Sequence, residues 1–231
     1  MSASRRGAYR WTSAVALLLS VLGARWMFGA STPRDVPGDL RAVMLQEPKA
    51  VPNVTLIDDH GRAVTAGALF RNRWSLVFLG FASCPAVCPA TLSQLATVKR
   101  SLGVLAGQPS GPPSSATTPP RYVFVSVDPR RDTPERLTLY LAAFDPDFMG
   151  VTGDPAALAR LSDALTAFHR LGAPDPSGDY GVVHSGEVYL IDPAGRAYAR
   201  FTPPLDTGAM TRQVRSLMSR YAGSARPAGA G

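Results

Sequence analysis

The feature that most constrains this chain is its only pair of cysteines, Cys84 and Cys88. They follow the apolar run Leu76–Phe81 and precede a helical pattern over Ala90–Leu105. A buried strand that leads into a helix through a loop with two thiols is a place for soft-metal or redox chemistry. A disulfide across so short a loop would stabilise the fold little. We therefore interpret the pair as reactive, and the alternative is two ordinary buried thiols.

The alternation of strands and helices predicts an α/β fold with a central, partly parallel (mixed) sheet and helices on both faces. Trp74–Phe81 and Tyr122–Val127 are apolar throughout, as central strands are. A thiol pair between the first buried strand and its helix is similar to the arrangement in thioredoxin-like folds. The remaining expected strands are hairpins over 51–65 and 187–201 and a single strand over 148–152. A short helix or turn is expected over 66–72. Further helices are expected after Asp132 as N-cap, from Asp154 to about Leu171, and over 207–221.

The N-terminal residues 1–30 have the pattern of a targeting segment, with arginines followed by the apolar stretch Ala14–Gly23. We expect a cytoplasmic stub and a single-pass anchor in the cell inner membrane, with the soluble domain facing the periplasm; the alternative is a cleaved signal. Residues 31–50 are expected to be a linker, 51–221 the folded domain and 222–231 a flexible tail. Residues 108–120 are rich in Pro, Ser, Gly and Thr and are expected to form a surface insertion.

The formal net charge of +7 does not indicate a nucleic-acid partner. Four of the arginines lie in residues 1–30, where there is no acidic residue, and no basic run or basic-aromatic stripe follows. Nucleic-acid binding normally leaves such a basic footprint. We therefore expect no nucleic-acid partner.

The cysteine spacing favours metal binding. Both thiols are expected at a helix N-terminus, which favours thiolate, and residues four apart on a helical turn can place two sulfurs on one ion. Thiolates select Cu(I), with Zn(II) as the common competitor, and a third ligand is needed. His60 is expected in a solvated turn, and His169 on a helix, at the surface or hydrogen-bonded. His184 precedes a strand at a sheet end, where α/β folds place sites, and position alone leaves its role open.

Several motifs together resemble those of the Sco/SenC copper proteins. Phe78–Pro89 and Val125–Glu135 carry the closest likeness, and three further motifs continue it in order over roughly residues 50–220: Ala143–Pro146, Val151–Gly153, and Tyr180 through His184 to Pro193. The resemblance implies a membrane-anchored, thioredoxin-like protein that binds copper, Cu(I) or Cu(II), through Cys84, Cys88 and His184.

The resemblance also implies partners and a role. It implies copper delivery to the binuclear site of the copper-bearing subunit of cytochrome c oxidase, or reduction of that site's cysteines, with other copper chaperones as further partners. The alternative is a membrane-anchored thiol–disulfide oxidoreductase that uses Cys84 and Cys88 on exported proteins. A peroxidase of the same fold would need a low-pKa cysteine in a different motif.

Two departures from the family's motifs and one further match bear on this likeness. Many family members have Thr-His before the first cysteine, where this chain has Ala82-Ser83, and many have Asp where it has Val183. An acidic neighbour could tune the histidine, so its replacement bears on affinity and partner choice. Asp128 resembles the family's aspartate at the end of the second buried strand, and the other interpretation is that it only caps a turn.

Overall fold

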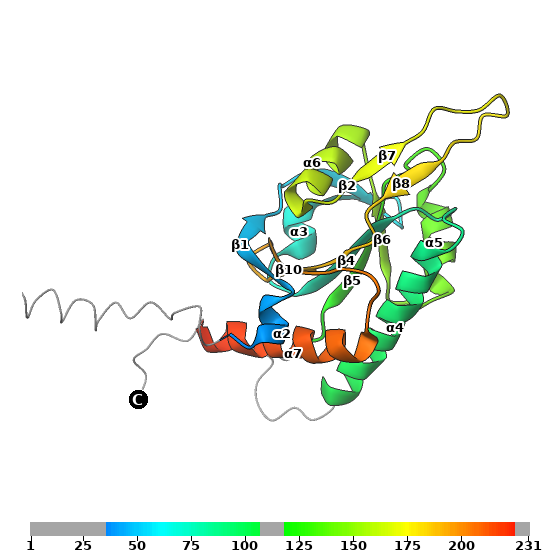
Figure 1. Cartoon of the computed structure of the whole chain (residues 1–231). Coiled ribbons are helices and arrows are strands. Elements are labelled where there is room, and N and C mark those ends of the chain that lie inside the picture. Colours follow the sequence, from blue (N-terminus) through cyan, green and yellow to red (C-terminus); the bar gives the residue numbers. More distant parts are fainter. Residues whose placement is uncertain (1–35, 107–117, 225–231) are drawn as a thin grey trace, which may run out of the picture. The chain divides into compact units, whose positions relative to one another are not determined.

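A computed structural model describes residues 36–106 and 118–224 (Figure 1). The described residues from Asp39 onward belong to one compact unit. The expected anchor or signal at 1–30, most of the 108–120 insertion and the tail from residue 225 lie outside the described residues. Among the residues described, no helix has the length and apolarity needed to cross a bilayer.

An eight-stranded sheet forms the centre, in the order β1-β10-β9-β4-β5-β6-β2-β3. The neighbours β4–β5 and β5–β6 are parallel and the remaining pairs are antiparallel, which confirms the predicted mixed sheet. The strands are β1 Met44–Ala50, β2 Thr55–Asp58, β3 Ala63–Thr65, β4 Ser75–Gly80, β5 Arg121–Ser126, β6 Met149–Thr152, β9 Val188–Ile191 and β10 Arg196–Phe201. All of β4 is buried, as its apolar sequence predicts.

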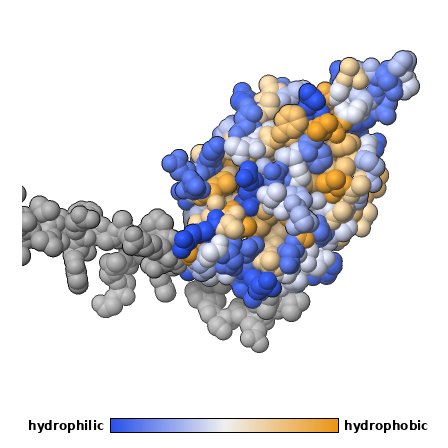
Figure 2. Space-filling model, viewed as in Figure 1, coloured by the Kyte–Doolittle hydropathy of each residue, from blue (hydrophilic) through white to orange (hydrophobic). Residues whose placement is uncertain are grey.

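Helices cover both faces of this sheet (Figure 1). They are α2 Gly38–Arg41, α3 Ala66–Phe70, α4 Val87–Ala106, α5 Pro134–Ala142, α6 Pro155–Leu165 and α7 Thr207–Ser224. Val77 and Leu79 of β4 share a core with residues of α3 and α6. On the other face, Phe124 of β5 contacts Tyr140 of α5 at 5.9 Å between ring centroids. The viewed surface mixes hydrophilic and hydrophobic residues, as globular domains do (Figure 2).

The expected linker at 31–50 contains folded structure. Both α2 and β1 lie within it, and β1 pairs with β10 at the edge of the sheet. Pro48 argues against a strand in the sequence, because proline within a sheet is confined to edge strands and bulges. The pairing of β1 with β10 is also irregular between Met44 and Lys49. Both features make this edge strand hard to recognise from the sequence. The folded unit therefore begins ahead of residue 51.

A second, two-stranded sheet was not predicted. It consists of β7 His169–Leu171 and β8 Val182–His184, with His169 opposite His184 (Figure 1). The prediction of a helix to about Leu171 is wrong, because α6 ends at Leu165. Thr166 adopts a left-handed conformation with φ 55°, a common way to end a helix. His169 therefore lies on a strand and not on a helix.

Candidate metal centre

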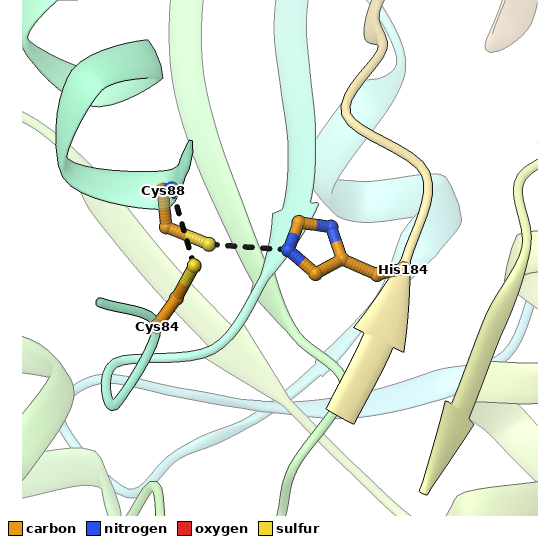
Figure 3. Close-up of side chains that lie close together, drawn as sticks. All are labelled: Cys84, Cys88 and His184. Atoms are coloured by element: carbon orange, nitrogen blue, oxygen red, sulfur yellow. Dashed lines mark hydrogen bonds between the residues drawn. The ribbon is translucent and has the colours of Figure 1, made fainter. Parts of the chain in front are cut away.

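The sheet topology brings two distant segments together. Cys84 lies in the loop after β4, Cys88 is in the first turn of α4, and His184 ends β8, just ahead of β9 (Figure 3). Because β9 runs antiparallel to β4, with Val188 opposite Phe78, the start of β9 lies beside the end of β4. One ligand atom from each of Cys84, Cys88 and His184 lies within 4.8 Å of the others.

The other two histidines lie elsewhere. His60 has a side chain 63% exposed and bonds to its neighbour Asp59, which fits the expected solvated turn. The Nδ1 atom of His169 lies 2.9 Å from the Ser162 hydroxyl, so this ring is hydrogen-bonded as expected. Neither ring is in the group formed by the two thiols and His184.

The surroundings of Cys84 and Cys88 shift their pKa values in opposite directions, whereas the sequence predicted that both thiols favour thiolate. Burial acts to raise the pKa of Cys84, but hydrogen bonds outweigh it and the net pKa is lowered. The backbone N–H of Cys88 donates to Cys84 Sγ at 3.4 Å, as helix N-termini do toward anions. Burial raises the pKa of Cys88, and the nearby Cys84 and Asp132 raise it further. Cys88 is fully buried, so a thiol is favoured there in the metal-free chain.

The imidazole of His184 has a defined tautomer. Its Nδ1 lies 2.8 Å from the Ser185 carbonyl oxygen, which can only accept, so Nδ1 carries the proton. Nε2 then presents its lone pair to Cys88 Sγ, 3.3 Å away (Figure 3). The ring makes edge contacts with Phe78 at 5.9 Å and Phe81 at 5.8 Å. Hydrogen bond and aromatic rings together orient Nε2 as a ligand.

Gly80 is a site residue that sequence reasoning missed. A Cβ at this position would lie 2.7 Å from Cys88 Sγ and 2.9 Å from Phe124 Cε2. The absence of a side chain at Gly80 is therefore what lets Cys88 pack against β4. A glycine inside a buried strand was the available signal, because it often marks such a close approach.

Asp132 holds the start of the cysteine loop. Its Oδ2 accepts from Ala82 N–H at 2.8 Å and from the Ser126 hydroxyl at 2.6 Å, and the residue is fully buried. Arg136 donates to the Ser83 hydroxyl at 2.8 Å in the same region. The expectation that Asp132 caps α5 is wrong, since Thr133 is the N-cap and accepts from Arg136 N–H. The Asp132 side chain points inward and leaves the cap to its neighbour.

The donor set fits a soft or borderline metal ion. Ligands that are about 2.0–2.3 Å from one ion lie roughly 3.5–4 Å apart, within the span of these atoms. Two sulfurs and one imidazole nitrogen suit copper, with zinc as a competitor. The same thiols could instead exchange electrons with a disulfide, since both are free cysteines here.

Comparison with known proteins decides the family. A sequence model described as SCO1/SenC matches residues 43–219. The chain belongs to the SCO1/SenC family. Its relatives include the mitochondrial protein SCO2 homolog of Bos taurus, 30% identical over 207 residues, covering 89% of this chain and 74% of the relative.

Solved structures of family members share the fold. Arabidopsis thaliana ScoI with copper bound is 26% identical, with a TM-score of 0.63 over 76% of this chain and 98% of that one. Bradyrhizobium japonicum ScoI with copper bound is 30% identical, with a TM-score of 0.57 over the same shares. The thioredoxin-type α/β fold predicted from the sequence is thereby confirmed.

Proposed function

We propose that this chain binds copper through Cys84, Cys88 and His184 and serves in the assembly of cytochrome c oxidase. The convergence of the three ligand atoms within 4.8 Å carries the proposal. Two family members with copper bound, from Arabidopsis thaliana and Bradyrhizobium japonicum, support copper as the metal. The solved relatives include a Sco protein described as a member of a family of cytochrome c oxidase assembly proteins.

The arrangement suits a carrier that gives up its metal. Two thiolates hold Cu(I), and an added imidazole also suits Cu(II), so both oxidation states are accommodated. Three protein ligands leave room for an incoming ligand from a partner. The flanking residues Val87 and Val183 are 50% and 54% exposed, so the rim of the site is open to contact. This geometry supports copper delivery by ligand exchange, with the copper-bearing oxidase subunit or another copper chaperone as the proposed partner.

The opposite pKa shifts of Cys84 and Cys88 favour reduction of a disulfide as a second role. The Cys84 thiolate would attack one sulfur of a client disulfide and release the other as thiolate. Cys88, after losing its proton, would then attack Cys84 Sγ and free the second client sulfur. Two electrons pass to the client, and Cys84–Cys88 becomes the disulfide. The two client sulfurs leave as thiolates and take up two protons, one released by Cys88 and one from solvent. The lowered pKa of Cys84 supports it as the attacking group.

The location is proposed from the sequence. Arginines followed by an apolar stretch in residues 1–30 favour an inner-membrane anchor with the described domain on the periplasmic side. Both proposed clients, the oxidase subunit and exported disulfide proteins, would be reached there.

A transfer experiment separates the two roles. Copper-loaded full chain is mixed with the metal-free, reduced copper-bearing domain of a cytochrome c oxidase, and copper is quantified on each protein after separation. Delivery predicts that copper moves to the acceptor. In parallel, the reduced, copper-free chain is mixed with the oxidised acceptor, and free thiols are counted. If copper stays on the chain while acceptor thiols appear, reduction replaces delivery; if neither occurs, the proposed function is wrong.

A further inference from the structure

The segment between β5 and α5 reaches both halves of the candidate metal centre. It carries two fully buried carboxylates, Asp128 and Asp132. Asp132 accepts from Ala82 N–H on the cysteine side. Asp128 faces the histidine side, where its Oδ1 accepts from the Tyr180 hydroxyl at 2.6 Å. Tyr180 lies in the connection that leads into β8, the strand that ends in His184.

Arg131 completes this contact. Its Nε donates to Asp128 Oδ2 at 2.5 Å and its Nη1 to Asp179 Oδ1 at 2.7 Å. Its guanidinium carbon lies 4.0 Å from the centroid of the Tyr180 ring and 5.9 Å from that of Phe81. Phe81 in turn contacts the His184 ring. We call Asp128, Arg131 and Tyr180 the clamp. The clamp connects the β5–α5 segment to the β7–β8 hairpin and to the Phe81 ring, which lies against His184.

The β7–β8 hairpin depends on such side-chain contacts. It forms a sheet of its own and shares no strand pairing with the eight-stranded sheet in the described ranges. At its base, Ser185 N–H donates to the Phe168 carbonyl at 2.7 Å, and His169 bonds to Ser162 of α6. The clamp attaches the connection between the two strands to the rest of the domain.

A local turn function does not account for the clamp. Two other buried aspartates, Asp58 and Asp192, each pair with an arginine four residues later and accept backbone N–H bonds in their own turn. Asp128 instead bonds to a tyrosine 52 positions away, across the fold. Its second oxygen is held by Arg131, which also reaches across to Asp179.

We propose that Asp128, Arg131 and Tyr180 are positioning residues that fix the β7–β8 hairpin so that His184 Nε2 faces the two thiols. This inference rests on the proposed copper function and deepens it. The clamp does not contact the sulfur atoms of the two cysteines or the Nε2 atom of His184. It acts through the backbone of the hairpin and through the Phe81 ring. Its loss lets the imidazole drift from the thiols, so copper keeps its two sulfurs and loses its nitrogen.

A double-mutant cycle tests the clamp. Cu(I) affinity is measured by competition on the reduced full chain with Tyr180→Phe and with Asp128→Asn, each alone and combined with His184→Ala. Charge-assisted hydrogen bonds set the scale, so each clamp variant should weaken binding roughly ten- to hundred-fold in the parent chain. In the His184→Ala background the same variants should change affinity by less than about threefold, since no imidazole remains to position.

Matched controls separate positioning from stability. Tyr122→Phe removes a buried hydroxyl that has no hydrogen-bond partner, and Asp192→Asn disrupts an equally buried aspartate turn away from the site. Both controls should leave Cu(I) affinity unchanged, even where Asp192→Asn lowers the urea midpoint. The positioning role of the clamp would be contradicted if the clamp variants lost equal Cu(I) affinity in the parent chain and in the His184→Ala chain. It would also be contradicted if Asp192→Asn lost as much Cu(I) affinity as Asp128→Asn.

A metal-free measurement keeps this inference distinct from the proposed function. In the reduced, copper-free chain, the imidazole nitrogen resonances of His184 report its contact with Cys88. Tyr180→Phe and Asp128→Asn should shift or broaden these resonances, and Tyr122→Phe should not. If the parent chain binds no copper yet the resonances respond, the copper function fails and the clamp stands. If the resonances are unchanged in both clamp variants, the clamp is wrong whether or not copper binds.

Discussion

The two thiols of the site occupy different environments four residues apart. Cys84 is half-buried and receives backbone N–H groups from the start of α4, which lowers its pKa. Cys88 is enclosed between α4 and Gly80, and burial raises its pKa. Metal binding needs both sulfurs as thiolates, and the raised pKa of Cys88 makes the loss of its proton the costlier of the two. Copper affinity should therefore fall as the pH is lowered.

This asymmetry predicts different alkylation profiles. Thiolate is the reactive form, so the rate for Cys84 should reach half its maximum at a pH below the 9.0 of an ordinary thiol. The rate for Cys88 should still be rising above that pH. Iodoacetamide rates from pH 5 to 10 on reduced Cys84→Ser and Cys88→Ser chains measure each thiol alone. Profiles that coincide, or a Cys88 that reacts at lower pH than Cys84, would contradict this account.

Gly80→Ala tests the close approach of α4 to β4. The new methyl group would overlap Cys88 Sγ and the Phe124 ring, and overpacking of this kind costs about 1–3 kcal/mol. We expect a lower urea midpoint and weaker Cu(I) binding, because the sulfur must move. Gly103→Ala in α4, where an added Cβ would meet nothing within 4 Å, serves as the control and should leave binding intact. Unchanged affinity in Gly80→Ala would show that Cys88 is free to shift.

At the scale of elements, β4 and α4 could be predicted and the β7–β8 hairpin could not. An unbroken apolar run and a proline in the first helical turn are local signals, and both appear in the structure. The hairpin strands have only three residues each and half-exposed side chains, so they carry no periodicity to detect. The position of His184 next to a sheet end was predictable, but its pairing with His169 was not.

The β5–α5 segment gives a prediction for the cysteine half of the site. Asp132→Asn places an amide where Oδ2 accepts from Ala82 N–H and the Ser126 hydroxyl, so one bond to the loop is lost. The free energy of unfolding should fall by about 1.5–3 kcal/mol, and Cu(I) affinity should fall with it.

The effect of Asp132→Asn should differ from that of the clamp variants. Because Asp132 anchors the cysteine loop, its loss should weaken Cu(I) binding in the His184→Ala background as well as in the parent chain. Asp192→Asn serves again as the stability control. If the Asp132 effect vanishes once His184 is removed, the assignment of Asp132 to the cysteine half is wrong.

For the whole molecule, the sheet order brings together Cys88 and His184, which lie 96 positions apart in the sequence. The crossover that places β9 beside β4 brings the approach to β9 against the loop after β4. The predicted strands and helices identify the fold class, but the pairing of β9 with β4 and the start of the domain at α2 and β1 depend on long-range contacts. Cys84 and Cys88 could be proposed as ligands because cysteine is rare in this chain, and His184 was added by the family resemblance. The contacts of Gly80, Tyr180 and Ser185 depend on the packing of other elements and could not be predicted.

The central claim is a three-ligand copper site, and a Cu(I) competition titration tests it most directly. The reduced full chain and its His184→Ala variant are titrated side by side against a chromophoric Cu(I) chelator. Tight binding of one copper per chain, weakened by orders of magnitude in the variant, is the predicted result. Weak binding, or binding of equal strength in the two chains, would contradict the site and leave thiol exchange as the function of the cysteine pair.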